Sequence, residues 1–330
     1  MRTALITGGA GFIGSHMVGC LLAEGWRIVA LDNFDPLYDR TVKLRNLHDY
    51  TDCDRFSFLE LDVRDRHGLE HRLTGAYDVI VHLAAKAGVG ASLENPLEYQ
   101  DVNIRGTQNL LDLARMWGVK QFIFASSSTV YGLNPRTPWS EEDLEVLPVS
   151  PYAVTKVCAE HLGRIYSYLY GIRFLALRLF SIYGPRQRPD LVIHRFARRI
   201  RCGKPVPVYG DGTTVRDYTF IEDAARGIRA AMDYEKSPFE VFNIGSSREV
   251  SLIEVVRALA NVSGLAVRYD YCSRHSADVP RTLADIRKAK RLLGYEPATG
   301  FEDGLYKFWM WFADRTVQSQ ALGAGMAASW

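Results

Sequence analysis

The chain has 330 residues, 47% of them hydrophobic and 24% charged, and its formal net charge is +2 at pH 7. These values are ordinary for a globular protein and leave room for one large or two modest domains. The small net charge gives no reason to expect nucleic acid as a partner. No apolar run is long enough to cross a bilayer, and Met1 stands almost directly before the first expected strand. We therefore expect neither a membrane protein nor a signal peptide.

The cysteines are scattered, odd in number and without metal-ligand spacing; they are Cys20, Cys53, Cys158, Cys202 and Cys272. This pattern favours a reduced, cytoplasmic chain and predicts no metal site.

The amino-terminal segment predicts a dinucleotide-binding unit. Thr3 to Ile6 is typical of a buried strand, and a helix is expected from Phe12. Between them, Gly8, Gly11 and Gly14 fall at three-residue spacing. Such glycines allow a tight turn, close approach of the backbone to a pyrophosphate, and close packing of the helix on the strand. A glycine triplet alone is a weak signal, because ordinary tight turns also contain it.

The next expected strand strengthens this interpretation. It covers Arg27 to Leu31 and ends in Asp32, about 20 residues beyond the glycines, where a carboxylate can bind a ribose hydroxyl. A carboxylate there would repel a 2′-phosphate, so we expect NAD rather than NADP as the cofactor.

Strands and helices alternate over the first 180 residues, which predicts an α/β fold of the Rossmann type with a doubly wound parallel sheet. The further strands are expected at Arg55–Leu61, Asp78–Leu83, Gln121–Ala125 and Arg173–Phe180, and the long helices at Pro96–Trp117 and Pro151–Tyr170. Asp62 and Val63 are suited to the adenine edge, and the small residues after Leu83 leave space for a cofactor.

Beyond residue 180 the elements shorten and glycine, proline and charge increase. We expect residues 1–180 to form the NAD-binding domain and residues 181–316 a smaller C-terminal substrate-binding lobe with segments returning to the sheet. Residues 317–330 are dominated by Ala, Gly and Ser, and we expect them to form a poorly ordered tail.

Tyr152 and Lys156 lie four residues apart, so they share one face of the expected helix. A free tyrosine has a pKa of roughly 10 and is a poor base at neutral pH. A nearby ammonium and the positive nicotinamide ring both favour the phenolate; lowering the pKa to near 7 requires about 4 kcal/mol of such stabilisation. Tyr152 would then act as a base toward a sugar hydroxyl. In an NAD-binding fold this pair predicts catalysis, although the same spacing occurs by chance in many helices.

Several motifs together resemble the extended short-chain dehydrogenase/reductase family of nucleotide-sugar epimerases and dehydratases, over nearly the whole chain up to about Phe312. They are Thr7-Gly-Gly-Ala-Gly-Phe-Ile-Gly14, His82-Leu-Ala-Ala85, Ser126-Ser-Ser-Thr-Val-Tyr-Gly132 and Pro151-Tyr-Ala-Val-Thr-Lys156. The resemblance implies catalysis by Ser127, Tyr152 and Lys156 and tightly held NAD. It also implies a homodimer that pairs the helices near Val102–Trp117 and Tyr152–Tyr170.

The motifs and the resemblance together define an expected cofactor site. Its residues are Gly8, Gly11, Phe12, Ile13, Gly14, Asp32, Asn33, Asp62, Val63, Leu83, Ala84, Ala85, Lys86, Tyr152 and Lys156.

The resemblance also separates two reactions within the family. Its 4,6-dehydratases carry an Asp-Glu pair just after the catalytic Ser or Thr, whereas Ser128 and Thr129 follow Ser127 here. The sequence thus favours 4-epimerisation of a UDP-sugar through a transient 4-keto intermediate, with no net redox change.

The segment from Tyr183 to Asp190 resembles that of UDP-glucuronate 4-epimerases, which implies that Ser181 and Arg188 hold the sugar carboxylate. The resemblance further implies that Arg195 and Arg216 neutralise the diphosphate. The expected substrate site comprises Ser128, Ser181, Arg188, Arg195, Arg216 and Asp278, with Asp278 on the uridine ribose. The alternative is that Arg186 and Arg188 are surface charges on a loop.

Two positions depart from the relatives: Gly90 and His275 each stand where an arginine is common in some of them. A small Thr282 permits a larger sugar substituent. Alternative functions are a UDP-glucose or UDP-N-acetylglucosamine 4-epimerase, a UDP-glucuronate decarboxylase, and a non-catalytic NAD-binding regulator.

Overall fold

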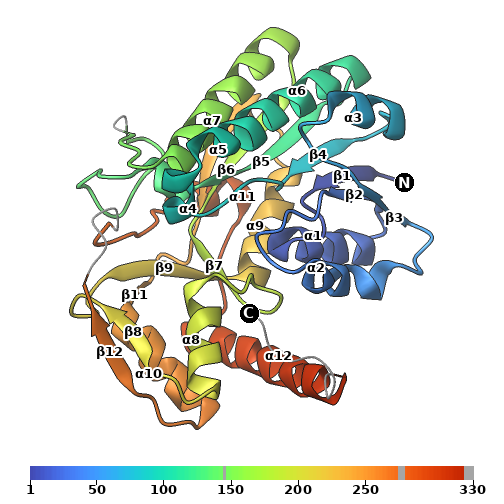
Figure 1. Cartoon of the computed structure of the whole chain (residues 1–330). Helices are drawn as coiled ribbons and strands as arrows, with labels where there is room; N and C mark the ends of the chain where they lie inside the picture. Colours follow the sequence, from blue (N-terminus) through green and yellow to red (C-terminus); the bar gives the residue numbers. More distant parts are fainter. Residues whose placement is uncertain (144–145, 274–278, 323–330) are drawn as a thin grey trace.

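The computed structural model describes residues 1–143, 146–273 and 279–322, and its centre is a seven-stranded sheet (Figure 1). The strand order is β10-β6-β5-β4-β1-β2-β3, and every neighbouring pair is parallel. The strands are β1 (Thr3–Thr7), β2 (Arg27–Asp32), β3 (Phe56–Glu60), β4 (Val79–His82), β5 (Gln121–Ser127), β6 (Arg173–Leu179) and β10 (Phe239–Ile244). The doubly wound parallel sheet expected from the sequence is confirmed.

Helices cover both faces of this sheet, as Figure 1 shows. On one face lie α3 (Arg66–Arg72), α4 (Val89–Glu94), α5 (Pro96–Gln100), α6 (Gly106–Trp117) and α7 (Pro151–Tyr170). On the other lie α1 (Phe12–Ala23), α2 (Arg40–Leu47), α9 (Ile221–Met232) and α11 (Arg287–Leu293). Short 3-10 turns occur at His48–Tyr50 and Ser128–Val130.

The central strands β1, β4, β5 and β6 are buried on both sides, which is why they appear in the sequence as largely apolar runs. In β5, Ile123 and Ala125 belong to the core beneath α1 and α9, whereas Phe122 and Phe124 belong to the core beneath α6 and α7. This alternation follows the two-residue repeat of a strand. Both cores are therefore assembled from successive residues of the same strands.

The strand order reverses at β1, which lies between β2 and β4. Open parallel sheets bind ligands outside the carboxyl ends of their strands at such a reversal. The fold therefore places the expected cofactor crevice directly after β1, β2 and β4.

A smaller lobe follows β6 and holds a three-stranded sheet, β11-β9-β7, and a two-stranded sheet, β12-β8. Its elements are β7 (Ser181–Tyr183), α8 (Val192–Arg201), β8 (Val206–Tyr209), β9 (Val215–Phe220), β11 (Glu249–Ser251), α10 (Leu252–Ser263), β12 (Tyr269–Cys272) and α12 (Phe301–Leu322). Between these elements, β10 pairs with β6, so the chain returns to the main sheet. Helix α12 continues past Val317, where the tail was expected; residues 323–330 lie outside the described residues.

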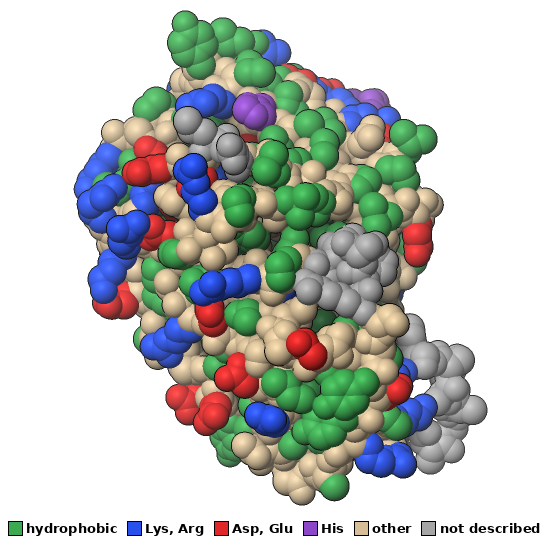
Figure 2. Space-filling model, turned by 90° about the vertical axis from the view of Figure 1, so that its left-hand side faces the viewer, with side chains coloured by type: hydrophobic (Ala, Val, Ile, Leu, Met, Phe, Trp, Pro, Cys, Tyr) green, Lys and Arg blue, Asp and Glu red, His purple; other side chains and the backbone are tan. Residues whose placement is uncertain are grey.

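Figure 2 shows hydrophobic side chains gathered on the smaller lobe, on the side where Figure 1 places β12. Tyr269 and Tyr271 on β12 are both exposed, and their rings stack with centroids 6.5 Å apart.

The helix expected over Pro96–Trp117 is interrupted by a π-helical turn at Asp101–Arg105. Within this turn the Asn103 side chain accepts a hydrogen bond from the Lys86 amide (2.8 Å) and donates one to the Lys86 carbonyl (3.0 Å). A π turn inserts an extra residue into a helix and is frequent at functional sites. Here it brings an amide side chain to the loop that follows β4.

A buried ion pair joins β5, β6 and α7. The Arg178 guanidinium on β6 donates two hydrogen bonds to Glu160 on α7, at 3.1 and 2.8 Å. Ser126 on β5 donates a third, 2.5 Å long, to the same carboxylate. Both charged side chains are less than a tenth exposed, so neither charge has water as an alternative partner.

We predict that Glu160→Gln lowers the free energy of unfolding by about 3–5 kcal/mol, because it leaves the buried Arg178 charge unpaired. Urea denaturation of the purified protein measures the change. Glu222→Gln is the control, since Glu222 pairs with Lys307 at the surface, where such a pair contributes about 0–1 kcal/mol. Equal, small changes in the two variants would contradict the expectation.

Candidate active site

One cavity of about 600 Å³ lies along the carboxyl ends of β1, β2, β4 and β5 and continues to the smaller lobe. Its volume and mixed lining are typical of a site for a small molecule or cofactor. Every residue of the expected cofactor site lines this cavity except Asp62.

The glycine loop forms the floor of the cavity near β1. Gly8 has a φ of +69°, in the left-handed region, and the Gly11 amide donates a 3.0 Å hydrogen bond to its carbonyl. A Cβ atom on Gly14 would lie 2.1 Å from the Gly8 carbonyl oxygen. Only a glycine allows this contact, so α1 begins against the loop, with its first amide groups at the cavity.

Asp32, at the end of β2, has two partners in the cavity. It accepts a 2.9 Å hydrogen bond from the Phe34 amide and forms a 3.1 Å ion pair with Lys43 of α2. Both charged side chains are almost fully buried. The pair is close to neutral, so charge repulsion of a 2′-phosphate is weaker than the carboxylate alone suggests. A carboxylate at this position can still accept hydrogen bonds from the ribose hydroxyls of NAD.

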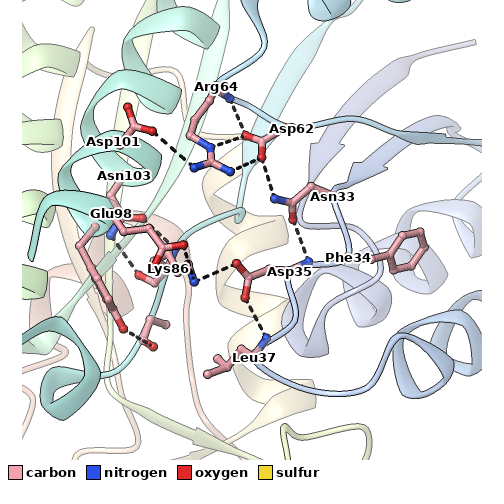
Figure 3. Close-up of polar contacts among 12 residues, drawn as sticks. Asn33, Phe34, Asp35, Leu37, Asp62, Arg64, Lys86, Glu98, Asp101 and Asn103 are labelled. Carbon is pink, nitrogen blue, oxygen red and sulfur yellow. Dashed lines mark hydrogen bonds and ion pairs between the residues drawn. The ribbon is translucent and has the colours of Figure 1, made fainter. Parts of the chain in front are cut away.

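Asp62 follows β3 and is held by its neighbours (Figure 3). It accepts hydrogen bonds from Arg64, with the shortest at 2.7 Å, and from the Asn33 side chain at 2.8 Å. Burial alone would raise the pKa of Asp62, but these hydrogen bonds outweigh it and lower the pKa to about 2. Asn33 also accepts a hydrogen bond from the Asp35 amide, so the loop after β2 is preorganised.

Lys86 links the two sides of the crevice, as Figure 3 shows. Its ammonium lies 3.0 Å from Asp35, in the loop after β2, and 2.9 Å from Glu98 on α5. Burial would lower the pKa of Lys86, but hydrogen bonds to Glu98 and Asp35 outweigh it and raise the pKa. An ion pair thus crosses from the loop after β4 to the loop after β2.

A chain of hydrogen bonds with a defined direction supports the loop after β4. Thr107 donates to the Asn103 carbonyl (2.6 Å), so its oxygen accepts from His82 Nε2 (3.0 Å). His82 Nδ1 then accepts from the Thr7 hydroxyl (2.7 Å), which in turn accepts from the Ala84 amide (3.1 Å). Burial lowers the pKa of His82 to about 3, consistent with this neutral tautomer. His82 therefore has a structural role.

Tyr152 and Lys156 project from the first turns of α7, which begins at a Ser150 cap. The Lys156 ammonium donates a 2.7 Å hydrogen bond to the Ala125 carbonyl on β5. Ser127, two residues further along β5, hydrogen-bonds with the Tyr152 side chain. The Ser127 oxygen accepts from the Thr129 hydroxyl (3.0 Å) and amide (3.2 Å), which leaves its own proton free to be donated to Tyr152. The structure thus brings the three expected catalytic residues together.

The protein groups alone keep Tyr152 protonated at neutral pH. Burial raises the pKa of Tyr152, and the hydrogen bond from Ser127 and the charge of Arg188 only partly oppose this rise. Burial lowers the pKa of Lys156 to about 7, with partial opposition from Glu160. A positive charge on Lys156 is therefore less secure than the sequence pattern suggests.

Four of the expected substrate residues line the cavity, namely Ser128, Ser181, Arg188 and Arg216. Arg188 forms a two-bond ion pair with Asp190, at 3.0 and 2.8 Å. Neighbouring Arg186 is different: it extends to the Tyr50 hydroxyl (3.0 Å) and to Asp49 and does not line the cavity. Of the two arginines in this turn, only Arg188 can meet a ligand there.

Other expected residues lie elsewhere. Arg195 is exposed on α8 and does not line the cavity, because the buried face of this helix is formed by Ile193, Phe196, Ala197 and Ile200. Thr282 is buried, and its hydroxyl accepts a hydrogen bond from the Asp217 amide, so it does not line the cavity either. Asp278 and His275 lie outside the described residues. A Cβ atom on Gly90 would meet nothing within 4 Å.

Sequence reasoning did not assign Tyr38, Lys43 or Asp190 to the site, although all three line the cavity. No motif marks Tyr38 or Lys43, since they come from the irregular segment after β2. Asp190 follows Arg188 by two residues, and this spacing was the available signal.

The model of one protein family, described as GDP-mannose 4,6 dehydratase, matches residues 5–308. The chain therefore belongs to this family, within the extended short-chain dehydrogenases. A UDP-glucuronate 4-epimerase of Thermodesulfobacterium geofontis is 41% identical over 310 residues, which cover 93% of this chain and 95% of the relative.

Solved structures agree with this assignment. UDP-glucuronic acid 4-epimerase from Bacillus cereus, in complex with UDP-glucuronic acid and NAD, is 35% identical with a TM-score of 0.88, covering 95% of this chain and 100% of that one. UDP-glucose 4-epimerase from Thermotoga maritima, with UDP-glucose, is 32% identical, also with a TM-score of 0.88, covering 96% and 100%. The family resemblance stated from the motifs is confirmed.

The lowered pKa of Lys156 predicts a pH dependence of stability. Its ordinary pKa is 10.5, and in the fold burial lowers it to about 7. Between these values the unfolded chain binds more protons at Lys156 than the folded chain does, so the contribution of this residue to stability rises with pH. We expect the stability difference between the wild type and Lys156→Met to change by up to about 1.4 kcal/mol per pH unit in favour of the wild type. Urea denaturation of both NAD-free proteins at pH 7, 8 and 9 measures this difference. If the unfolding free energies of the two proteins change in parallel with pH, the Lys156 pKa is not lowered.

Proposed function

We propose that this chain is an NAD-dependent UDP-sugar 4-epimerase whose main substrate pair is UDP-glucuronate and UDP-galacturonate. One observation carries the proposal: the glycine loop, the Tyr152 phenol and the Arg188 guanidinium line a single cavity. The relative from Thermodesulfobacterium geofontis, named a UDP-glucuronate 4-epimerase, supports the choice of sugar.

The lining fits NAD because Gly8, Gly11 and Gly14 line the cavity where α1 begins, so none of these residues places a side chain between a pyrophosphate and the backbone amides. We propose that the glycine loop with Phe12 and Ile13 binds the pyrophosphate and that Asp32 and Asn33 bind the adenosine ribose. Asp62 and Val63 would border the adenine, while the loop from Leu83 to Lys86 would cover the cofactor. Structures of relatives containing NAD support this assignment.

Tyr152 is proposed as the base that removes the proton from the sugar 4-hydroxyl, assisted by Ser127. The Ser127 hydroxyl donates to the Tyr152 oxygen and so stabilises the phenolate. When protonated, Lys156 would add positive charge from the same helix face, and it would also bind the nicotinamide ribose. When bound, NAD supplies a hydride acceptor and donor at carbon 4 and a positively charged ring that favours the phenolate.

The proposed reaction has no net redox change, because carbon 4 of the 4-keto sugar regains the hydride on the opposite face. The sugar must therefore rotate within the cavity while the diphosphate stays bound. We propose that Arg216 and Ser128 contribute to holding the substrate during this rotation; both line the cavity.

The carboxylate of a 4-keto glucuronate makes it a β-keto acid, which loses carbon dioxide readily. We propose that Arg188 and Ser181 hold this carboxylate and keep its charge localised. A guanidinium can bind a carboxylate through two parallel hydrogen bonds, which fixes its orientation. Arg195 and Asp278 stay proposals from the family resemblance, on the diphosphate and the ribose respectively.

We predict that Tyr152→Phe lowers kcat for epimerisation by about 10²–10⁴-fold while bound NAD is retained, because the phenolic proton path is lost. NMR product analysis with UDP-glucuronate measures the rate. Tyr168→Phe is the control, since this tyrosine is 87% exposed on the same helix.

Conversion of UDP-glucose but not of UDP-glucuronate would overturn the choice of sugar, and a pentose product would indicate decarboxylation. Bound NAD without any conversion would favour a non-catalytic regulator.

We also propose a homodimer formed through α6 and α7. The outer face of α7 carries exposed apolar side chains, including Val154, Ile165 and Leu169, and Met116 on α6 is similarly exposed. Apolar side chains gathered on one helix face are typical of surfaces that bind another protein. Their position over the expected pairing helices supports the dimer.

We expect Ile165→Glu to convert the dimer to monomer, because it places a charge in an apolar interface. Sedimentation velocity measures the mass. Met310→Glu is the control, because Met310 is comparably exposed but lies on α12, in the smaller lobe. A wild-type chain that sediments as a monomer would refute the dimer.

A cytoplasmic location is also proposed. It is supported by the five cysteines, all of them free thiols. Within the described part of the chain, no helix combines the length and apolar character required to span a membrane.

A further inference from the structure

Arg188 and Asp190 form a charge pair inside the sugar end of the cavity. The Arg188 Nε atom donates to Asp190 Oδ1 at 3.0 Å, and Nη2 donates to Oδ2 at 2.8 Å. Both residues line the cavity, and their side chains are 20% and 38% exposed. A 3.2 Å hydrogen bond from the Leu191 amide to the Arg188 carbonyl closes the turn that brings the two side chains together.

Asp190 occupies only one edge of the guanidinium. An arginine has five N–H donors in a fixed plane, and Asp190 takes one on Nε and one on Nη2. The remaining edge consists of Nη1 and the second hydrogen of Nη2, and it has no hydrogen-bond partner among the described residues. A second carboxylate can therefore bind this edge without displacing Asp190.

The pair also determines the charge that a sugar meets. Burial would raise the pKa of Asp190, but the hydrogen bond from Arg188 outweighs it and lowers the pKa, so Asp190 is ionised at neutral pH. Arg188 lies close enough to Tyr152 to lower the pKa of its phenol, which places the pair near the reacting end of the cavity. Other titratable groups near the pair are Tyr38, Tyr99 and His194.

We infer that Asp190 is a specificity-determining residue which lets this sugar site accept neutral UDP-hexoses as well as UDP-uronates; the inference rests on the proposed UDP-sugar epimerase function. With a neutral sugar, Arg188 stays paired with Asp190, so no cation is left without a partner when the sugar displaces water. With an acidic sugar, the free edge of Arg188 binds the carboxylate. The charge of Asp190 weakens this second attraction.

The test is equilibrium binding of UDP-glucuronate and UDP-glucose, measured by isothermal titration calorimetry on the NAD-containing protein. We expect the wild type to bind both sugars. In Asp190→Asn the affinity ratio should shift by about tenfold toward UDP-glucuronate, because the neutral sugar now faces an unpaired arginine and the acidic sugar loses a repelling charge. Glu60→Gln is the matched control, since Glu60 forms a two-bond pair with Arg40 away from the cavity and should leave the ratio unchanged.

The double variant Arg188→Ala, Asp190→Asn distinguishes a role of Asp190 in sugar specificity from a role in supporting the loop. The effect of Asp190→Asn on the ratio should vanish in the Arg188→Ala background, because the guanidinium transmits it. Equal weakening of both sugars by Asp190→Asn, a shift toward UDP-glucose, or a wild type that binds UDP-glucuronate alone would overturn the inference. Binding of both sugars without epimerisation would instead overturn only the proposed function. If neither sugar binds, both the inference about Asp190 and the proposed function are wrong.

Discussion

The hydrogen bond from the Lys156 ammonium to the Ala125 carbonyl is the contact on which the site depends. It is 2.7 Å long and buried, and it fixes the start of α7 over the end of β5. Tyr152, one turn earlier, is thereby held beside Ser127, and Glu160, one turn later, reaches the buried guanidinium of Arg178. Tyr152, Lys156 and Glu160 lie four residues apart, so they share one helix face. Tyr152 is the proposed base, Lys156 binds the end of β5, and Glu160 binds Arg178 on β6.

Paired charges surround the crevice. Lys43 is matched by Asp32, Lys86 by Asp35 and Glu98, and Arg188 by Asp190. At Lys43, Lys86 and Arg188, a ligand that carries phosphate or carboxylate therefore meets a cation that already has a partner. Binding must reorganise or share these pairs, which favours selection by geometry over simple attraction.

The sequence predicted the parts of the site that local pattern determines. The glycine spacing, the strand ending in Asp32, and the shared face of Tyr152 and Lys156 all depend on residues close together in the chain. The ion-pair partners were not predictable in this way, because Lys43 and Glu98 reach the crevice from separate elements. The role expected for Arg195 came from the family resemblance, and the local pattern adds a different fact: the periodicity of α8 places Arg195 at an exposed position outside the cavity. The strand β9 has no clear hydrophobic alternation, because its buried face includes the polar residues Asp217 and Thr219.

The π turn at Asp101–Arg105 makes the length of the chain in this region as important as its composition. Removing one residue there would convert the π turn into a regular helical turn, because the π turn is where the helix accommodates its extra residue. Asn103 would then lose the position from which its side chain forms two hydrogen bonds with the Lys86 backbone. Substitutions on the outer surface of this segment should be tolerated far better than any change in the number of its residues.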